Sequence, residues 1–227
     1  MDPNEILGIF RLDKQEYLEL ILDGKLRFTP IEKYKVAEEK ESHRNDSMEG
    51  LKRVSQDAGR KGWIPFVFDS GPAAGAGFEI KVVTQVKVAG ALSNISVLCF
   101  STVTRTDIPE LEEFSRYKMD PRMFEFGNVA LVIRDMKQFI DRFLARAKEM
   151  GVKPDNGLVE YVDGDRYEGM IKRIGFAKLK DPFHYQKEYR LALRFNDKAP
   201  KDFILDIGSI RDIAEIRPLF QPKEEAD

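Results

Sequence analysis

The chain has 227 residues, of which 42% are hydrophobic, and its 37 basic and 39 acidic side chains leave a formal charge of −2. This length predicts a single domain with its own core at residues 1–220 and a charged tail at residues 221–227. The near balance of charges excludes a generally basic nucleic-acid-binding surface and leaves only a local basic patch open.

Cysteine and histidine are too few for a disulfide framework or a zinc site. Cys99 is the only cysteine, and His43 and His184 lie far apart without the spacing of metal ligands. We therefore expect no bound metal and a reducing, cytoplasmic location. The sequence has no basic leader and no run of about 18 apolar residues, so we expect neither export nor a membrane span.

The first predicted elements are a short helix and a strand. Asp13 and Glu16 form a capping box, apolar residues recur after it at helical spacing, and Gly24 ends the helix. Residues 25–29 alternate as a strand, and this alternation turns Arg27 away from the core side.

A polar box and a glycine-rich segment follow. Asn45, Asp46 and Glu49 predict either a capped helical turn or a group of ligand-binding side chains. Residues 69–77 are rich in glycine but lack the Gly-Lys-Ser/Thr ending of a phosphate-binding loop. We therefore predict an ordinary loop there, between two strands.

The middle of the chain predicts the centre of a sheet. Residues 78–88 and 95–104 have the pattern of strands, and the second is mostly apolar and carries Ser101 and Thr102 near its end. Residues 106–126 mix two prolines with charged and aromatic residues, which predicts an irregular or helical insertion.

The second half of the chain predicts more strands than helices. Asp135 caps a helix that extends to Met150, and residues 166–173 predict a shorter helical segment. Strands are predicted at residues 128–133, 158–162, 203–206 and 213–216. Short turns join several of these strands, so the predicted fold is α+β with an antiparallel or mixed sheet.

Residues 183–195 alternate like a strand that carries a carboxylate. Gln186, Glu188 and Arg190 share one face, and aromatic and leucine side chains occupy the other. Two rises along a strand place Gln186 and Glu188 roughly 6–7 Å apart, close enough to hold one small polar ligand between them. The simpler interpretation is an exposed strand face of Glu, Arg and Lys.

Three short segments occur in an order that is typical of one enzyme family. Arg27 lies on an early strand, Phe100-Ser101-Thr102 on a middle strand and Gln186-Lys187-Glu188 on a late strand. In this the chain resembles the Arg-Ser-Glu mono-ADP-ribosyltransferases, and the resemblance implies a split-sandwich fold with NAD as co-substrate. It also implies that Arg27, Ser101 and Glu188 converge on one cleft, beside which we expect the Asn45–Glu49 box.

The resemblance also implies individual roles. Arg27 would hold the diphosphate or a ribose of NAD, and Ser101 and Thr102 would hold the nicotinamide half. Glu188 would place its charge near the oxocarbenium-like ribose, and Gln186 would contact the acceptor nucleophile or the ribose. Aromatic stacking on nicotinamide would come from one of three residues: Tyr34, Phe100 or Tyr185. The acceptor would be an intracellular protein or nucleic acid, with bacterial or phage conflict as one setting.

A second resemblance covers more of the chain. The chain resembles the prokaryotic family known as domain of unknown function number 2971 in five segments: Asn45-Asp46-Ser47-Met48-Glu49, Cys99-Phe100-Ser101, Val159-Glu160-Tyr161, Phe176-Ala177-Lys178 and Gln186-Lys187-Glu188-Tyr189-Arg190. Ser47 stands where that family usually has proline, and the tryptophan-containing helix that often follows the Cys-Phe-Ser strand is missing.

Two other functions fit the sequence. A phage-encoded or mobile-element binding protein would use Arg44, Arg190, Arg194 and the loop at residues 69–77 as a contact surface without catalysis. A Mg²⁺-dependent nuclease would use the carboxylate-x-Lys tripeptide Glu79-Ile-Lys81, although no partner aspartate is evident.

Overall fold

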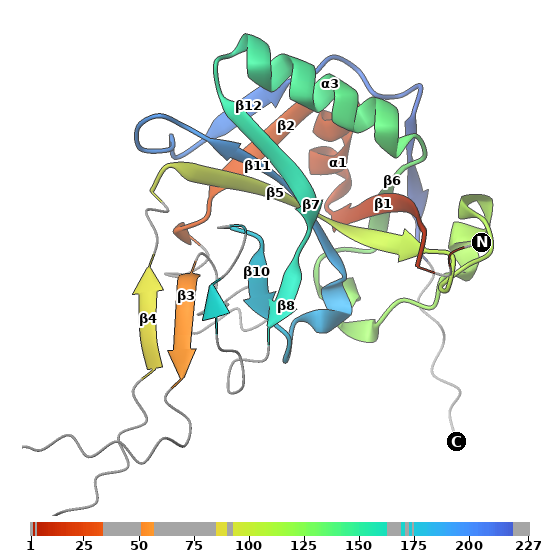
Figure 1. The fold of residues 1–227 in the computed structure, drawn as a ribbon. Coiled ribbons are helices and arrows are strands. Elements are labelled where there is room, and N and C mark those ends of the chain that lie inside the picture. The colour runs from red at the N-terminus through yellow and green to blue at the C-terminus, as the bar shows by residue number, and fades with distance from the viewer. Residues whose placement is uncertain are drawn as a thin grey trace, which may run out of the picture.

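The computed structural model describes residue 2 and residues 4–33, 51–56, 85–89, 93–162, 169–170, 173 and 175–219. For residues 51–56, 85–89, 169–170 and 179 it describes the backbone alone. Within these ranges the chain has the predicted α+β class, with a large antiparallel sheet and few helices (Figure 1). The strands of the large sheet are β1 (Ile6–Asp13), β2 (Lys25–Pro30), β5 (Ile95–Thr104), β6 (Val129–Ile133), β7 (Lys153–Leu158), β11 (Glu188–Arg194), β12 (Phe203–Asp206) and β13 (Ala214–Pro218).

Smaller elements surround this sheet. The α-helices are α1 (Gln15–Leu22) and α3 (Met136–Glu149), and the 3₁₀ helices are η1 (Leu111–Arg116), η2 (Pro121–Glu125) and η3 (His184–Gln186). β8 (Glu160–Val162) pairs in parallel with β10 (Ala177–Leu179), and β3 (Leu51–Gln56) pairs with both β4 (Gln85–Ala89) and β9 (Gly169–Met170). No helix in the described part of the chain has the length and apolar character needed to cross a membrane.

β5 lies inside the sheet, and two different strands, β2 and β1, pair with successive parts of one of its edges. β11 pairs with one edge of β5 up to Ser101. On the other edge, β2 pairs with Ser96 and Val97, and β1 pairs with residues 101–104. Residues 98–100 lie between these two pairings, at a place that we call the fork.

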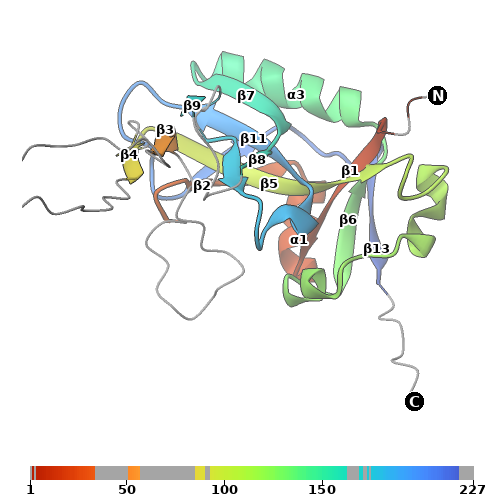
Figure 2. The same cartoon turned by 60° about the horizontal axis from the view of Figure 1, so that its bottom comes forward.

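One face of β5 packs against the α-helices (Figures 1 and 2). Leu98 and Phe100 belong to the main hydrophobic cluster, which also contains Phe139 and Phe143 of α3. Phe28 of β2 stacks on Phe143 with ring centroids 5.9 Å apart. This layer is the core that fixes the sheet.

The opposite face of β5 carries two smaller apolar clusters. Val103 packs with Phe114 of η1 in one cluster, and Val97 packs with Phe176 in the other. Because side chains alternate along a strand, Ser101 lies on this same face, between the two clusters. The fold therefore brings a polar segment of β5 between two patches of core.

Most elements that depend on local signals are confirmed. Strands β2, β5, β6, β12 and β13 lie within a few residues of their predicted bounds, and residues 106–126 form the predicted insertion as η1 and η2. The Asp135 carboxylate caps α3 by accepting a hydrogen bond from the backbone N–H of Gln138 at 2.9 Å. Gly24 follows α1 with φ +85°, and a Cβ there would lie 2.0 Å from the carbonyl oxygen of Gly208.

Three predictions about elements are wrong. Asp13 does not cap α1, because it ends β1 and its carboxylate pairs with Arg11. Residues 169–170 are not helical but form β9, which pairs with Arg53 and Val54 of β3. The strand predicted at residues 183–195 begins only at Glu188, because η3 precedes it. β1 and most of β7 were not predicted.

The cap on α3 gives a stability prediction. Replacing Asp135 with alanine should lower the free energy of unfolding by about 0.5–2 kcal/mol, because it leaves a backbone N–H of the first helical turn without its acceptor. Urea denaturation measures this change. Asp141→Ala, which removes only the exposed pair with Lys137 on the same helix, should leave the midpoint almost unchanged. Equal shifts in the two variants would contradict a capping role.

Candidate functional site

Glu188 is the centre of a buried ionic cluster. It opens β11 directly opposite Ser101 of β5, and only 4% of it is exposed. Its Oε1 accepts a hydrogen bond from Nε of Arg190 at 2.5 Å, and its Oε2 accepts one from Nζ of Lys178 at 3.1 Å. The exposed strand face expected here is therefore wrong, because apolar clusters flank the position on both sides.

The cluster keeps Glu188 ionised. Burial raises the pKa of the Glu188 carboxyl, but the charges of Arg190 and Lys178 and the hydrogen bond from Arg190 outweigh burial. The pKa of Glu188 is therefore held below its usual range, and the side chain is a carboxylate anion at neutral pH.

Gln186 reaches the same cluster from a different element. It ends η3, and the left-handed Lys187 separates it from β11. Its Oε1 nevertheless accepts a hydrogen bond from Nζ of Lys178 at 2.7 Å, so Gln186 and Glu188 share one ammonium group. Its Nε2 donates to the hydroxyl of Tyr185 at 3.2 Å. The two side chains meet as predicted, although not along one strand.

Ser101 and Thr102 point in different directions. Ser101 is buried on the face that carries Glu188. The Thr102 hydroxyl instead donates to the backbone carbonyl of Lys187 at 3.0 Å. Phe100 lies on the helix face, where it packs edge-on against Phe139 with centroids 5.6 Å apart. Phe100 is thus a core residue, and its predicted stacking on nicotinamide is wrong.

Arg27 does not join this cluster. Its guanidinium donates to the carboxylate of Asp202 at 2.8 Å, and both side chains are 63% exposed. β2 pairs with β5 only through Thr29 and Pro30, and Arg27 lies beyond that pairing, opposite Ile204 of β12. Ser101 and Glu188 therefore lie opposite each other on paired strands, whereas Arg27 lies apart from them, so the three residues do not converge as predicted.

Arg11 occupies the fork, and sequence reasoning missed it. Its Nη1 donates to the backbone carbonyl of Cys99 at 2.7 Å, and its Nη2 pairs with Asp13 at 2.9 Å. It is half-buried. The available signal was a single arginine in the apolar run from Ile6 to Leu12, which is unusual unless the charge has a partner.

Lys178 and Tyr161 were also missed as members of the cluster. The Tyr161 hydroxyl accepts a hydrogen bond from the backbone N–H of Glu188 at 2.9 Å. Burial and then the nearby Glu188 charge raise the pKa of Tyr161, so its hydroxyl stays protonated. Lys178 lies on β10, with its ammonium 4.8 Å from the ring centre of Phe183. Both residues belong to segments quoted above for the second family resemblance.

The remaining candidates divide into three groups. Tyr185 is half-buried beneath the guanidinium of Arg122, which lies 3.9 Å from its ring centre. Arg190 is fully buried, so its predicted place on an exposed contact surface is wrong, whereas Arg194 is exposed. Outside the described residues lie Tyr34, Arg44, Asn45, Asp46, Glu49, residues 69–77 and the tripeptide Glu79-Ile-Lys81.

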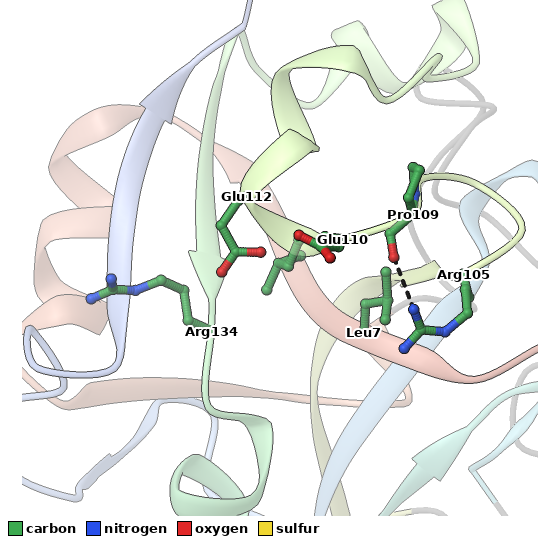
Figure 3. A pocket seen from close by; sticks show the side chains of 7 residues that line it. Leu7, Arg105, Pro109, Glu110, Glu112 and Arg134 are labelled. Carbon is green, nitrogen blue, oxygen red and sulfur yellow. Dashed lines mark hydrogen bonds between the residues drawn. The ribbon is translucent and has the colours of Figure 1, made fainter. Parts of the chain in front are cut away.

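An open pocket of about 410 Å³ lies elsewhere (Figure 3). It is lined by Leu7, Arg105, Pro109, Glu110, Leu111, Glu112 and Arg134. Figure 3 shows the Arg105 guanidinium bound to the carbonyl of Pro109, at 3.0 Å. None of the predicted site residues lines this pocket. Within the described ranges, no three His, Cys, Asp or Glu side chains gather closely enough to hold a metal ion.

Comparison with known proteins gives no relative. No protein-family model, no curated protein and no solved structure matches this chain.

A second ionic contact borders the cluster and gives a pH prediction. Asp107 accepts hydrogen bonds from Nζ of Lys187 at 2.5 Å and from the N–H and hydroxyl of Thr104 at 3.0 and 2.9 Å. Burial raises the pKa of Asp107, but these hydrogen bonds outweigh burial and lower it. The Asp107 carboxylate thus stabilises the folded state fully above its pKa in the unfolded chain, about 3.9. This stabilisation is lost as the pH falls through the lower pKa that Asp107 has in the folded state.

Asp107→Asn should therefore be less stable than the wild type near neutral pH, and the difference should shrink below about pH 4. Urea midpoints of both proteins at several pH values measure this. A difference that stays constant down to acid pH would contradict the assignment.

Proposed function

We propose that this chain is an NAD-dependent mono-ADP-ribosyltransferase or NAD glycohydrolase with a split-sandwich fold. The observation that carries the proposal is the direct pairing of Glu188 with Ser101, on strands next to the fork that Arg11 occupies. Arginine, serine and glutamate then follow one another in chain order on neighbouring strands, as in the resemblance described above, with Arg11 in place of Arg27.

The chemistry needs an anion beside a developing cation. When the bond between nicotinamide and ribose breaks, its electron pair leaves with nicotinamide and positive charge develops on the ribose ring. An acceptor oxygen or nitrogen then bonds to the ribose carbon and loses a proton; in the hydrolase reaction the acceptor is water. Glu188 is ionised before substrate arrives, because its pKa is lowered, and it would favour that charge without a proton transfer.

Arg11 would hold the diphosphate at the fork, which its side chain enters from the helix face of β1, because it alternates there with Phe10 on the face of Ser101. Its guanidinium lies at the fork, bound to a backbone carbonyl and one carboxylate. A guanidinium suits phosphate because it donates two parallel hydrogen bonds with a full charge. Ser101, buried opposite Glu188, would contact the nicotinamide half.

The arrangement described here is closed. Both oxygens of Glu188 are bound to cations, and Lys178 is only 7% exposed. The proposal therefore requires Lys178 and Gln186 to move away from Glu188 when NAD binds. Lysine is suited to such movement because its four-carbon stem is flexible.

The same closure favours a second candidate, a non-catalytic binding protein. A carboxylate that is neutralised by two buried partners is explained by a structural role alone, because such groups can specify the fold. In that case the function would reside in exposed side chains. Of the two predicted contact residues within the described ranges, Arg190 is buried and Arg194 is exposed.

Release of nicotinamide from NAD separates the two candidates. The purified chain is incubated with NAD, with and without cell lysate as a source of acceptors, and nicotinamide is measured by chromatography. The proposal predicts release above that of heat-unfolded protein. In the transferase case, NAD carrying a labelled adenine should also label an acceptor in the lysate, and digestion with protease or with nuclease shows whether that acceptor is protein or nucleic acid. An absence of both release and NAD binding favours the binding protein.

A further inference from the structure

Lys187 has an unusual backbone conformation. Its φ of 42° and ψ of 52° are left-handed, and among the described residues no other non-glycine residue has positive φ. Lysine adopts this region rarely, because its Cβ crowds the following carbonyl. Such a conformation persists only where surrounding contacts fix it.

Three hydrogen bonds fix Lys187 to β5 and its following turn. Its carbonyl accepts from the N–H of Thr102 at 2.9 Å and from the Thr102 hydroxyl at 3.0 Å. Its ammonium donates to Asp107 at 2.5 Å, and Asp107 is itself held by Thr104. The carbonyl of Lys187 is thus bound to the strand that carries Ser101, and its ammonium to the turn that follows this strand.

This fixed residue determines how its two neighbours meet. Gln186 ends η3 and Glu188 begins β11, so Lys187 is the single residue that joins the two elements. With Lys187 in its left-handed conformation, Gln186 and Glu188 both contact the Lys178 ammonium, at 2.7 and 3.1 Å. An extended residue at this position would continue the strand, leave the two side chains roughly 6–7 Å apart on one face, and turn η3 into a different direction.

We propose that Lys187, locked in its left-handed conformation by Thr102 and Asp107, is the positioning residue for the Glu188 carboxylate and for Gln186. This rests on the proposed function for its catalytic consequence, because the carboxylate must face the reacting ribose. The position of the Glu188 carboxylate depends on Lys187 whether or not the chain is an enzyme.

Three variants test the proposal. Lys187→Val and Lys187→Asn both lose the bond to Asp107 and keep the carbonyl that Thr102 binds, so they differ in backbone preference. Lys187→Val places a β-branched residue where φ is positive and should displace Glu188, whereas asparagine tolerates this region and should preserve the turn. We expect Lys187→Val to lower kcat by about 10–100-fold with KM for NAD nearly unchanged, since a misplacement of about 1 Å costs this much. Lys187→Asn should stay within about threefold of wild type, and Lys198→Val in an exposed loop should have no effect.

A second readout does not depend on turnover. The carboxyl ¹³C signal of Glu188, assigned by its loss in Glu188→Gln, should move in Lys187→Val and stay in place in Lys187→Asn. If Lys187→Val does not fold, Thr102→Val removes only the hydroxyl bond to Lys187 and should shift the signal in the same direction by less.

The two failures are distinguishable. If the Glu188 signal is the same in Lys187→Val as in the wild type, the positioning role is wrong. If the signal moves as expected but the wild type releases no nicotinamide, Lys187 positions the carboxylate and the proposed enzymatic function is wrong.

Discussion

Replacing Glu188 with glutamine is expected to slow nicotinamide release by about 10²–10³-fold, the loss that commonly follows removal of one well-placed electrostatic group. Glutamine keeps the size of the side chain but removes its charge and replaces one of its two acceptor oxygens with an NH₂ donor, so it can accept from only one of Arg190 and Lys178. The charge is present in the wild type at neutral pH because Arg190 and Lys178 lower the pKa of the carboxyl despite its burial.

The same variant is expected to be less stable. Glu188 is bound to two buried cations, and removing one member of a buried ionic group typically costs about 3–5 kcal/mol. An exposed strand-face glutamate would have changed stability by only about 0.5 kcal/mol. Activity must therefore be compared with a control that is destabilised to a similar extent.

Phe143→Ala is that control. Phe143 is fully buried on the helix face of the sheet, where its loss should also cost about 3–5 kcal/mol. Both variants and the wild type are assayed at a temperature at which circular dichroism shows each to be folded. Slow release in Glu188→Gln with near-normal release in Phe143→Ala supports the catalytic role. An equal loss in the two variants would mean that activity follows stability alone.

Replacing Arg11 with methionine is expected to raise KM for NAD by about 10–100-fold. A hydrogen bond to a charged group contributes about 1.5–3 kcal/mol, and each 1.4 kcal/mol is a factor of ten in binding. Methionine fills similar space without the guanidinium. The change also removes the bonds to Cys99 and Asp13 at the fork, so the thermal midpoint is measured alongside.

Arg27→Met is the matched control for Arg11→Met. Arg27 forms an exposed pair with Asp202, and such pairs contribute little to stability. Its KM for NAD and its thermal midpoint should match those of the wild type. A raised KM in Arg27→Met with a normal KM in Arg11→Met would place the phosphate contact on β2 and contradict the role given to Arg11.

Elements with local signals were predictable from sequence. β5 has a continuous apolar run, and α3 has an aspartate that caps it, so both follow from neighbouring residues. β1 was missed because both of its faces are buried, with Ile9 on the helix face and Phe10 on the other, which removes the alternation that marks a strand.

The composition of the site depends on contacts that no local pattern contains. Alternation correctly placed Glu188 on a face with Arg190, but the same pattern describes an exposed face and a covered one. The cover comes from distant residues such as Lys178 and Phe176. In the same way, strand pairing alone decides that Arg11 and not Arg27 lies at the fork.

The catalytic role of Glu188 can be examined in a crystal structure of the chain with an NAD analogue that cannot be cleaved. We expect the nicotinamide ribose within hydrogen-bonding distance of the Glu188 carboxylate, with Lys178 displaced and the diphosphate against Arg11. An analogue bound elsewhere, or one that does not bind, with Lys178 still paired to Glu188, would contradict that role.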